Sequence, residues 1–143
     1  MKIAIGSDNI GLELKEDLIK FLNERQVEYQ DFGTNENQRT DYPIYAQKVA
    51  IAVTKEGFDL GILICGTGIG MSIAANKIHG VRAAACSDSY SARLARNHNN
   101  ANILAMGALV VGKGLARMAG RGMDRSPVRR VASSEKDCLD QPA

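Results

Sequence analysis

Short apolar runs alternate with amphipathic stretches along most of this sequence, and this alternation restricts the fold more than any other feature. KIAI at 2–5 and GILIC at 61–65 are two such runs, and a helical pattern follows each of them. GILIC is apolar on both faces, which is typical of a strand covered by helices on each side. Strand–helix alternation of this kind predicts an α/β fold with an open parallel sheet.

The expected helices are amphipathic. In GLELKEDLIKFLNER, Leu14, Leu18 and Leu22 recur every four residues and predict one buried face. We expect the charged side chains of this stretch, Lys15 among them, to point away from that face. Pro43 suits the first turn of a second helix with a similar apolar stripe.

The chain length of 143 residues fits one domain with a packed core, and about five strands fit before Gly112. Ligands of open α/β sheets bind outside the carboxyl ends of the strands. We therefore expect the pocket to gather the residues that follow the strands, at 6–9, 65–67, 86–88 and around Gly107.

Charge and composition favour a small-molecule partner. The formal net charge of +2 argues against nucleic acid or an anionic membrane surface as the main partner. The apolar run at the start, in MKIAIGSD, is too short for a signal-peptide core. No other apolar run is as long as a membrane span, so we expect a soluble cytoplasmic protein. Cys65, Cys86 and Cys138 form no CxxC pair, which argues against a disulfide framework or a zinc site.

A glycine-rich loop stands out in ILICGTGIGMSIAANK at 62–77. Glycine at 66, 68 and 70 permits positive φ and close approach of a ligand, so that amide groups can face an anion. Cys65 directly precedes this loop, and a thiol beside backbone donors at a helix N-terminus can serve as nucleophile or base. A tight turn without ligand and an inert buried cysteine are the alternatives. The spacing matches neither a Walker loop nor a dinucleotide fingerprint.

Two further residues have open roles. His98 lies near an expected helix end, where a histidine acts either as a cation at the helix C-terminus or in catalysis. The asparagines that follow it suit either sugar hydroxyls or helix termination. Asp8, at the end of the first strand, is either a helix N-cap or a pocket carboxylate. We expect His79 to be exposed.

Besides GSD at 6–8 and the glycine-rich loop, the chain contains RTDYP at 39–43, VRAA at 81–84 and ARNHNNANILAMG at 95–107. These motifs together closely resemble one family, the type B ribose-5-phosphate isomerases and related galactose-6-phosphate isomerases. The likeness implies a single-domain Rossmann- or flavodoxin-like three-layer sandwich with a five-stranded parallel sheet. It also implies a homodimer or dimer of dimers with active sites at the subunit interface, and aldose–ketose isomerisation of a sugar phosphate without metal or cofactor.

The resemblance implies roles for individual residues. The cysteine matching Cys65 moves a proton between C1 and C2, the histidine matching His98 opens the sugar ring, and the aspartate matching Asp8 helps to move hydroxyl protons. The glycine loop holds the enediolate oxygens, where backbone donors stabilise the developing charge. The predicted catalytic residues are Cys65, His98, Asp8 and Thr67, and the predicted substrate-binding residues are Asn9, Asp41, Tyr42, Gly66, Gly68, Ile69, Gly70, Asn76 and Asn99.

Two departures from the family pattern concern the phosphate. Asn9 stands where the family usually has histidine, and Leu109 stands where it usually has arginine. Both remove donors for a dianion, which should weaken phosphate binding more than proton transfer. Ribose 5-phosphate is the first substrate expected. The alternatives are another sugar phosphate, an unphosphorylated rare sugar, or a weakly active sugar-phosphate-binding subunit.

The C-terminal segment is the third departure. The family continues with a long helix and a basic segment, whereas residues 118–143 have no apolar period and suit a poorly ordered tail. Codons can be chosen for residues 122–139 that, read one nucleotide later, encode most of the family's C-terminal motif. This suggests a frameshift near 118–122. We therefore predict an isomerase domain at 1–117 followed by an atypical tail.

Overall fold

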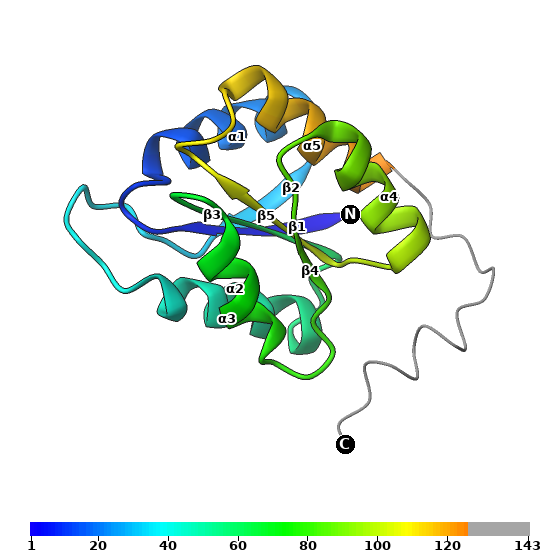
Figure 1. The fold of residues 1–143 in the computed structure, drawn as a ribbon, viewed down its shortest axis with the longest axis horizontal. Helices are drawn as coiled ribbons and strands as arrows, with labels where there is room; N and C mark the ends of the chain where they lie inside the picture. The colour runs from blue at the N-terminus through cyan, green and yellow to red at the C-terminus, as the bar shows by residue number, and fades with distance from the viewer. Residues whose placement is uncertain (126–143) are drawn as a thin grey trace.

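The computed structural model describes residues 1–125, in which strands and helices alternate (Figure 1). The strands are β1 (Lys2–Ser7), β2 (Glu28–Asp31), β3 (Leu60–Cys65), β4 (Ala83–Ala85) and β5 (Ile103–Gly107). The helices are α1 (Leu12–Glu24), α2 (Tyr42–Lys55), α3 (Ile69–Asn76), α4 (Ser89–Asn99) and α5 (Lys113–Arg125). Within the described part of the chain, no helix is long and apolar enough to cross a membrane.

All five strands belong to one parallel sheet in the order β2-β1-β3-β5-β4. This confirms the predicted five-stranded parallel sheet. The order exchanges the last two strands relative to the flavodoxin order. The exchange arises because α3 leads the chain to β4 at the edge of the sheet, and α4 then leads it back to β5 beside β3.

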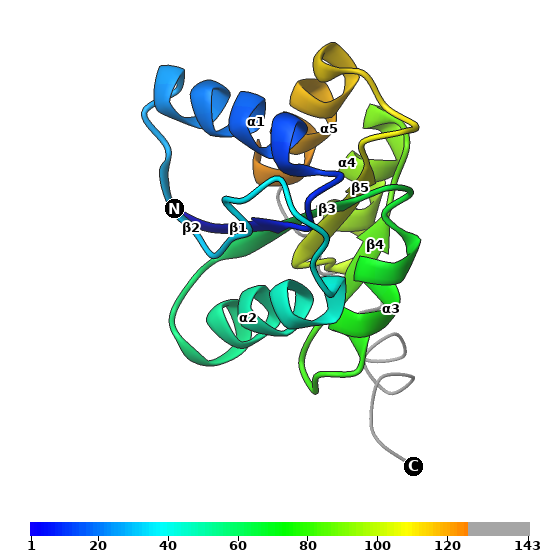
Figure 2. The ribbon, with the colours of Figure 1, turned by 90° about the vertical axis from the view of Figure 1, so that its left-hand side faces the viewer.

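Helices cover both faces of the sheet, as the apolar strands predict (Figure 2). Helices α1, α4 and α5 cover one face and share a hydrophobic cluster with Ile3 and Ile5 of β1. Helices α2 and α3 cover the other face and share a second cluster with Ala4 and Leu63. The alternation of β1 residues between the two clusters follows from the two-residue period of a strand.

In helix α1 the predicted buried face is confirmed, but the predicted exposure of Lys15 is wrong. Leu14, Leu18 and Leu22 are buried against the sheet, as their spacing predicts. Lys15 was expected to point away from that face, yet it is buried with an exposed fraction of 0%. Asp31 lies 2.8 Å from its ammonium group, so a charged partner from β2 makes this burial possible.

Helix α5 continues to Arg125, past Met118, where the sequence pattern predicted that ordered structure stops. Ala116, Ala119 and Met123 are buried at helical spacing against the main cluster, although glycine and arginine residues stand between them in the sequence. That part of the tail prediction is therefore wrong.

Ion pairs join α5 to α1. Arg117 contacts Asp17 at 2.9 Å, and Arg25 contacts Asp124 at 2.7 Å. The rest of the predicted tail, residues 126–143, lies outside the described residues, so the division at 117 and the frameshift stay predictions.

Candidate active site

The candidate site lies where the carboxyl ends of β1 and β3 meet. The crossover after β1 leads to β2, whereas the crossover after β3 leads the opposite way to β4, so the winding of the chain reverses here. Ligands bind at such switch points of open α/β sheets. Because Ser7 pairs with Ile64, Asp8 and Cys65 follow on neighbouring strands. Both are buried, with exposed fractions of 7% for Asp8 and 6% for Cys65.

The loop after Cys65 bends sharply over the end of β5. Gly68 has a φ of 83°, and its amide donates a hydrogen bond to Cys65 Sγ at 3.2 Å. A Cβ on Gly68 would lie 2.9 Å from the Met106 carbonyl carbon, and a Cβ on Gly107 would lie 2.6 Å from Thr67 Cα. Glycine is therefore required at both positions. The predicted positive φ is confirmed at Gly68, and the close approach of a ligand to this loop stays a prediction.

Asp8 fixes the start of α1. Its Oδ1 accepts a hydrogen bond from the Gly11 amide at 2.9 Å. Gly11 itself packs so closely on β3 that a Cβ there would lie 2.7 Å from Ile64. The N-cap of α1 is Gly11 and has no side-chain capping hydrogen bond, so Asp8 holds the turn before the helix and is not its N-cap. The role of the Asp8 carboxylate in proton transfer stays a prediction.

The start of α2 reaches the same loop. A Cβ on Gly70 would lie 2.9 Å from the Tyr42 ring, so this tyrosine packs directly on the start of α3. Asp41 is the N-cap of α2, but its side chain makes no capping hydrogen bond. Asn9 Oδ1 accepts a hydrogen bond from the Thr40 amide at 3.4 Å, which brings the segment before Asp41 close to the end of β1.

His98 and Asn99 lie at the amino ends of the strands, whereas Cys65 lies at the carboxyl ends. Helix α4 begins after the carboxyl end of β4 and runs back to the amino end of β5. The Asn99 carbonyl there accepts a hydrogen bond from Arg82 Nε at 2.7 Å, directly before β4. The length of β5 separates this edge from Cys65 by about 13 Å. One chain therefore does not bring His98 and Cys65 together.

Asn76, at the end of α3, lies at that opposite edge as well. Its amide donates to the Ala83 carbonyl at 2.9 Å and accepts from the Ala83 amide at 2.8 Å. These two bonds fix the connection from α3 to β4. The prediction that Asn76 binds substrate is not tested by them. His79, as predicted, is exposed.

The residues after β4 differ from those after β3. Burial raises the pKa of the Cys86 thiol, and the nearby Asp88 carboxylate raises it further. Hydrogen bonds from Ser91 lower the pKa of Asp88, which is the N-cap of α4. This strand end was expected to line the pocket, and its contacts here are those of a helix cap.

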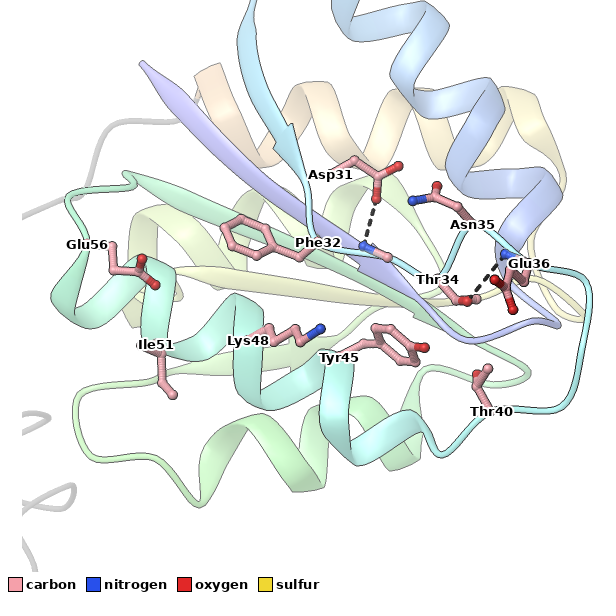
Figure 3. Close-up of a pocket in the computed structure, with 11 residues that line it drawn as sticks. Asp31, Phe32, Thr34, Asn35, Glu36, Thr40, Tyr45, Lys48, Ile51 and Glu56 are labelled. Atoms are coloured by element: carbon pink, nitrogen blue, oxygen red, sulfur yellow. Dashed lines mark hydrogen bonds between the residues drawn. The ribbon is translucent and has the colours of Figure 1, made fainter.

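A groove of about 730 Å³ lies between the end of β2 and α2 (Figure 3). None of the predicted site residues lines it. It is lined by Asp31, Phe32, Gly33, Thr34, Asn35, Glu36, Thr40, Tyr45, Lys48, Ile51 and Glu56. Sequence patterns did not single out this groove, because its walls combine the loop after β2 with one side of α2, which come together only in the fold. Among residues 1–125, no cluster of three or more histidine, cysteine or acidic residues is suited to a metal ion.

Known proteins match this chain over most of its length. The family described as Ribose/Galactose Isomerase matches residues 3–121. This chain belongs to that family. A Listeria innocua relative named Ribose-5-P isomerase B is 59% identical over 116 residues, which are 81% of this chain and 78% of the relative. The Ribose-5-phosphate isomerase B of Escherichia coli is 56% identical over 117 residues, which are 82% of this chain and 78% of that protein.

The solved structures of the ribose/galactose isomerase family share this fold. The Ribose-5-Phosphate Isomerase B of Clostridium thermocellum superimposes with a TM-score of 0.94 at 46% sequence identity, covering 98% of this chain and 95% of that one. The α/β fold and the isomerase family that the motifs predict are both confirmed. The sequence match ends at residue 121, close to the point where the sequence departs from the family pattern.

Proposed function

We propose that this protein interconverts ribose 5-phosphate and ribulose 5-phosphate through an enediolate. The observation that carries the proposal is the Cys65 thiol, buried at the switch point and hydrogen-bonded to the Gly68 amide. A base and a backbone donor that lie this close suit a reaction in which a proton leaves carbon and negative charge appears on the adjacent oxygen. Membership of the isomerase family supports the same chemistry.

In the proposed reaction, the Cys65 thiolate takes the proton from C2 of the open-chain aldose. The electron pair of the C2–H bond forms the C1=C2 bond, and the C1 carbonyl becomes an oxyanion that the loop amides and Thr67 stabilise. Asp8 carries the hydroxyl proton from O2 to O1. The C2 carbonyl then forms as Cys65 returns its proton to C1, which completes the ketose.

Ring opening requires a second chain in this proposal. His98 and Asn99 lie at the far edge of the sheet from Cys65, so we assign ring opening to His98 of the partner subunit in a homodimer or dimer of dimers. Exposed apolar side chains around the glycine loop support an interface there, because such a patch favours burial against a partner. Ile69, Ile73, Leu109 and Val110 are each more than half exposed.

Complementation between two inactive variants tests the shared site. We expect Cys65→Ala and His98→Ala to be inactive on cyclic ribose 5-phosphate when each is expressed alone. Co-expressed, they should recover about one quarter of the wild-type activity, since about half of the dimers are mixed and each mixed dimer holds one intact site. No recovery in dimers shown to be mixed by mass spectrometry would contradict a shared site. His98→Ala should also spare an open-chain substrate more than a cyclic one.

The substrate itself is tested by assaying ribulose 5-phosphate formation beside ribose as the unphosphorylated control. Asn9 and Leu109 favour a weak phosphate site, and Leu109 lies 3.5 Å from a Cβ placed on Gly66, at the edge of the loop. Activity on the phosphorylated sugar that requires Cys65 supports the proposal. Activity on ribose alone indicates an isomerase for an unphosphorylated sugar. Inactivity on both contradicts the proposal and leaves an isomerase for another sugar phosphate or a binding subunit.

A further inference from the structure

Lys15 is a buried cation that the proposed chemistry does not use. Its ammonium group donates hydrogen bonds to Asp31 Oδ1 at 2.8 Å, to Asn35 Oδ1 at 3.1 Å and to the Thr34 carbonyl. An ammonium group has three donors, so these three acceptors satisfy it completely. Burying a charge is costly unless it is paired and hydrogen-bonded. The partners of Lys15 all come from the end of β2 and the loop after it.

That loop is fastened to the last residue of β1. Asp31 Oδ1 also accepts a hydrogen bond from the Gly33 amide at 2.9 Å (Figure 3). The Ser7 amide donates to the Gly33 carbonyl at 2.7 Å, and the Thr34 amide donates to the Ser7 carbonyl at 2.7 Å. Lys15 and Ser7 thus hold residues 33–34 from two sides, directly before Asp8.

The same loop leads into the candidate site. The Thr40 amide at its far end contacts Asn9 Oδ1, and Asp41 and Tyr42 come next. The Tyr42 ring then packs on Gly70 of the glycine loop. The hydrogen bonds of Lys15, Ser7 and Asn9 to this loop and the Tyr42–Gly70 contact, joined by short stretches of chain, therefore link the buried ammonium group to the start of α3.

We propose that Lys15 is a positioning residue for this active site. It holds the 32–41 loop so that Tyr42 stays against the glycine loop, and it makes no contact with the substrate. The proposal rests on the isomerase function proposed above. Its alternative is that Lys15 stabilises the fold without affecting the site.

Limited proteolysis tests the hold of Lys15 on the loop without using enzyme activity. Arg39 is exposed in this loop, and trypsin cleaves after arginine. In Lys15→Met we expect the fragment that ends at Arg39 to form about tenfold faster than in the wild type, because cleavage follows the population of the opened loop. Arg25→Met is the matched control, since it breaks a similarly buried ion pair between α1 and Asp124 of α5, away from the loop. Equal cleavage after Arg39 in both variants would overturn the proposal.

Activity then separates positioning from stability. At a temperature at which both variants are folded by circular dichroism, Lys15→Met should lower kcat/KM at least about tenfold, and Arg25→Met should leave it unchanged. Should Lys15→Met not fold, Asp31→Asn weakens the same ion pair and should act in the same direction. Wild-type protein without isomerase activity would refute the proposed function, and the cleavage rates would still decide the role of Lys15 in holding the loop.

A double-mutant cycle measures the coupling between Lys15 and Tyr42 in kcat/KM, which a purely structural role of Lys15 would not produce. Tyr42→Ala removes the ring through which Lys15 acts, so adding Lys15→Met to it should change kcat/KM by less than about threefold. Independent effects would instead multiply, and the double variant would lose at least about a further tenfold. Multiplicative loss would mean that Lys15 does not act through Tyr42.

Discussion

The ends of β3 and β4 form an internal comparison, because a buried cysteine lies at each of them. Cys65 is the last residue of β3, and Cys86 directly follows β4. Their exposed fractions are nearly equal, 6% and 7%. A helix begins within a few residues of each cysteine, so the two thiols have similar positions in the fold.

The N-cap residue of the next helix makes the two ends chemically different. Gly68, the N-cap of α3, has no side chain, and its amide donates to Cys65 Sγ. Asp88, the N-cap of α4, accepts a hydrogen bond from the Ser91 amide at 2.6 Å. Burial raises the pKa of Cys86, and the Asp88 carboxylate raises it further. A glycine at the N-cap thus leaves backbone donors for the thiol and a ligand, whereas an aspartate occupies them and opposes thiolate formation.

The largest expected difference is between the two cysteine-to-alanine variants. Cys65→Ala should lower kcat by about 10²–10⁴-fold, the range that a positioned general base contributes. Cys86→Ala should keep kcat within about twofold and lower the free energy of unfolding by about 1 kcal/mol, a typical effect of a core truncation. Steady-state kinetics and urea unfolding measure the two effects. Comparable loss of kcat in both variants would remove the distinction between the strand ends.

The next difference concerns the two aspartates. Asp8 and Asp88 each accept a hydrogen bond from the amide three residues later, and asparagine keeps such an acceptor. The unfolding midpoint of Asp8→Asn should therefore be close to that of Asp88→Asn. Asp8→Asn should also lower kcat by about 10²-fold, because asparagine cannot carry the proton between the hydroxyl groups. Full activity of Asp8→Asn would show that Asp8 only holds the turn before α1 and takes no part in proton transfer.

A smaller effect is expected when a side chain is added to the glycine N-cap. Gly68→Ala places a Cβ at positive φ and against the Met106 backbone, which should cost about 1–3 kcal/mol of stability and weaken the contact with Cys65. Gly112→Ala is the control, because nothing lies within 4 Å of its Cβ position. Equal thermal stability of the two variants would show that the loop relaxes around the new side chain.

The smallest effect is a pH dependence at the β4 end. The pKa of Asp88 is lowered by its hydrogen bonds with Ser91, so the folded state favours the carboxylate. The stability that Asp88 contributes is therefore complete above its unfolded pKa of about 3.9 and is lost as the pH falls through the folded value. Urea unfolding should show wild type more stable than Asp88→Asn at pH 7, with the gap closing below about pH 3.9. A constant gap would attribute the difference to causes other than this titration.

The sequence predicted those parts of the molecule that depend on local pattern. Strand–helix alternation indicated the parallel sheet, and the glycine spacing indicated the positive φ that Gly68 adopts. The burial of Lys15 could not be predicted in this way, because its partners lie 16 to 20 residues further along the chain. The exchange of β4 and β5 likewise depends on long-range pairing, which periodicity does not encode.

The place of His98 could have been predicted from topology. A helix that follows a parallel strand returns to the amino edge of the sheet, so a residue at the end of such a helix lies far from the strand ends that bind ligands. The motif resemblance grouped His98 with Cys65 in one site at a subunit interface, but it did not assign the two residues to different chains.

The separation of Cys65 and His98 by the length of β5 has a consequence for the kinetics. If each site draws on two chains, catalytic competence depends on protein concentration as well as on folding. Specific activity on the cyclic sugar would then fall on dilution below the dimer dissociation constant, while every chain stays folded. In a cell with few copies, the enzyme would then be folded but inactive on the cyclic sugar. The isomerisation rate would rise more steeply than the protein concentration.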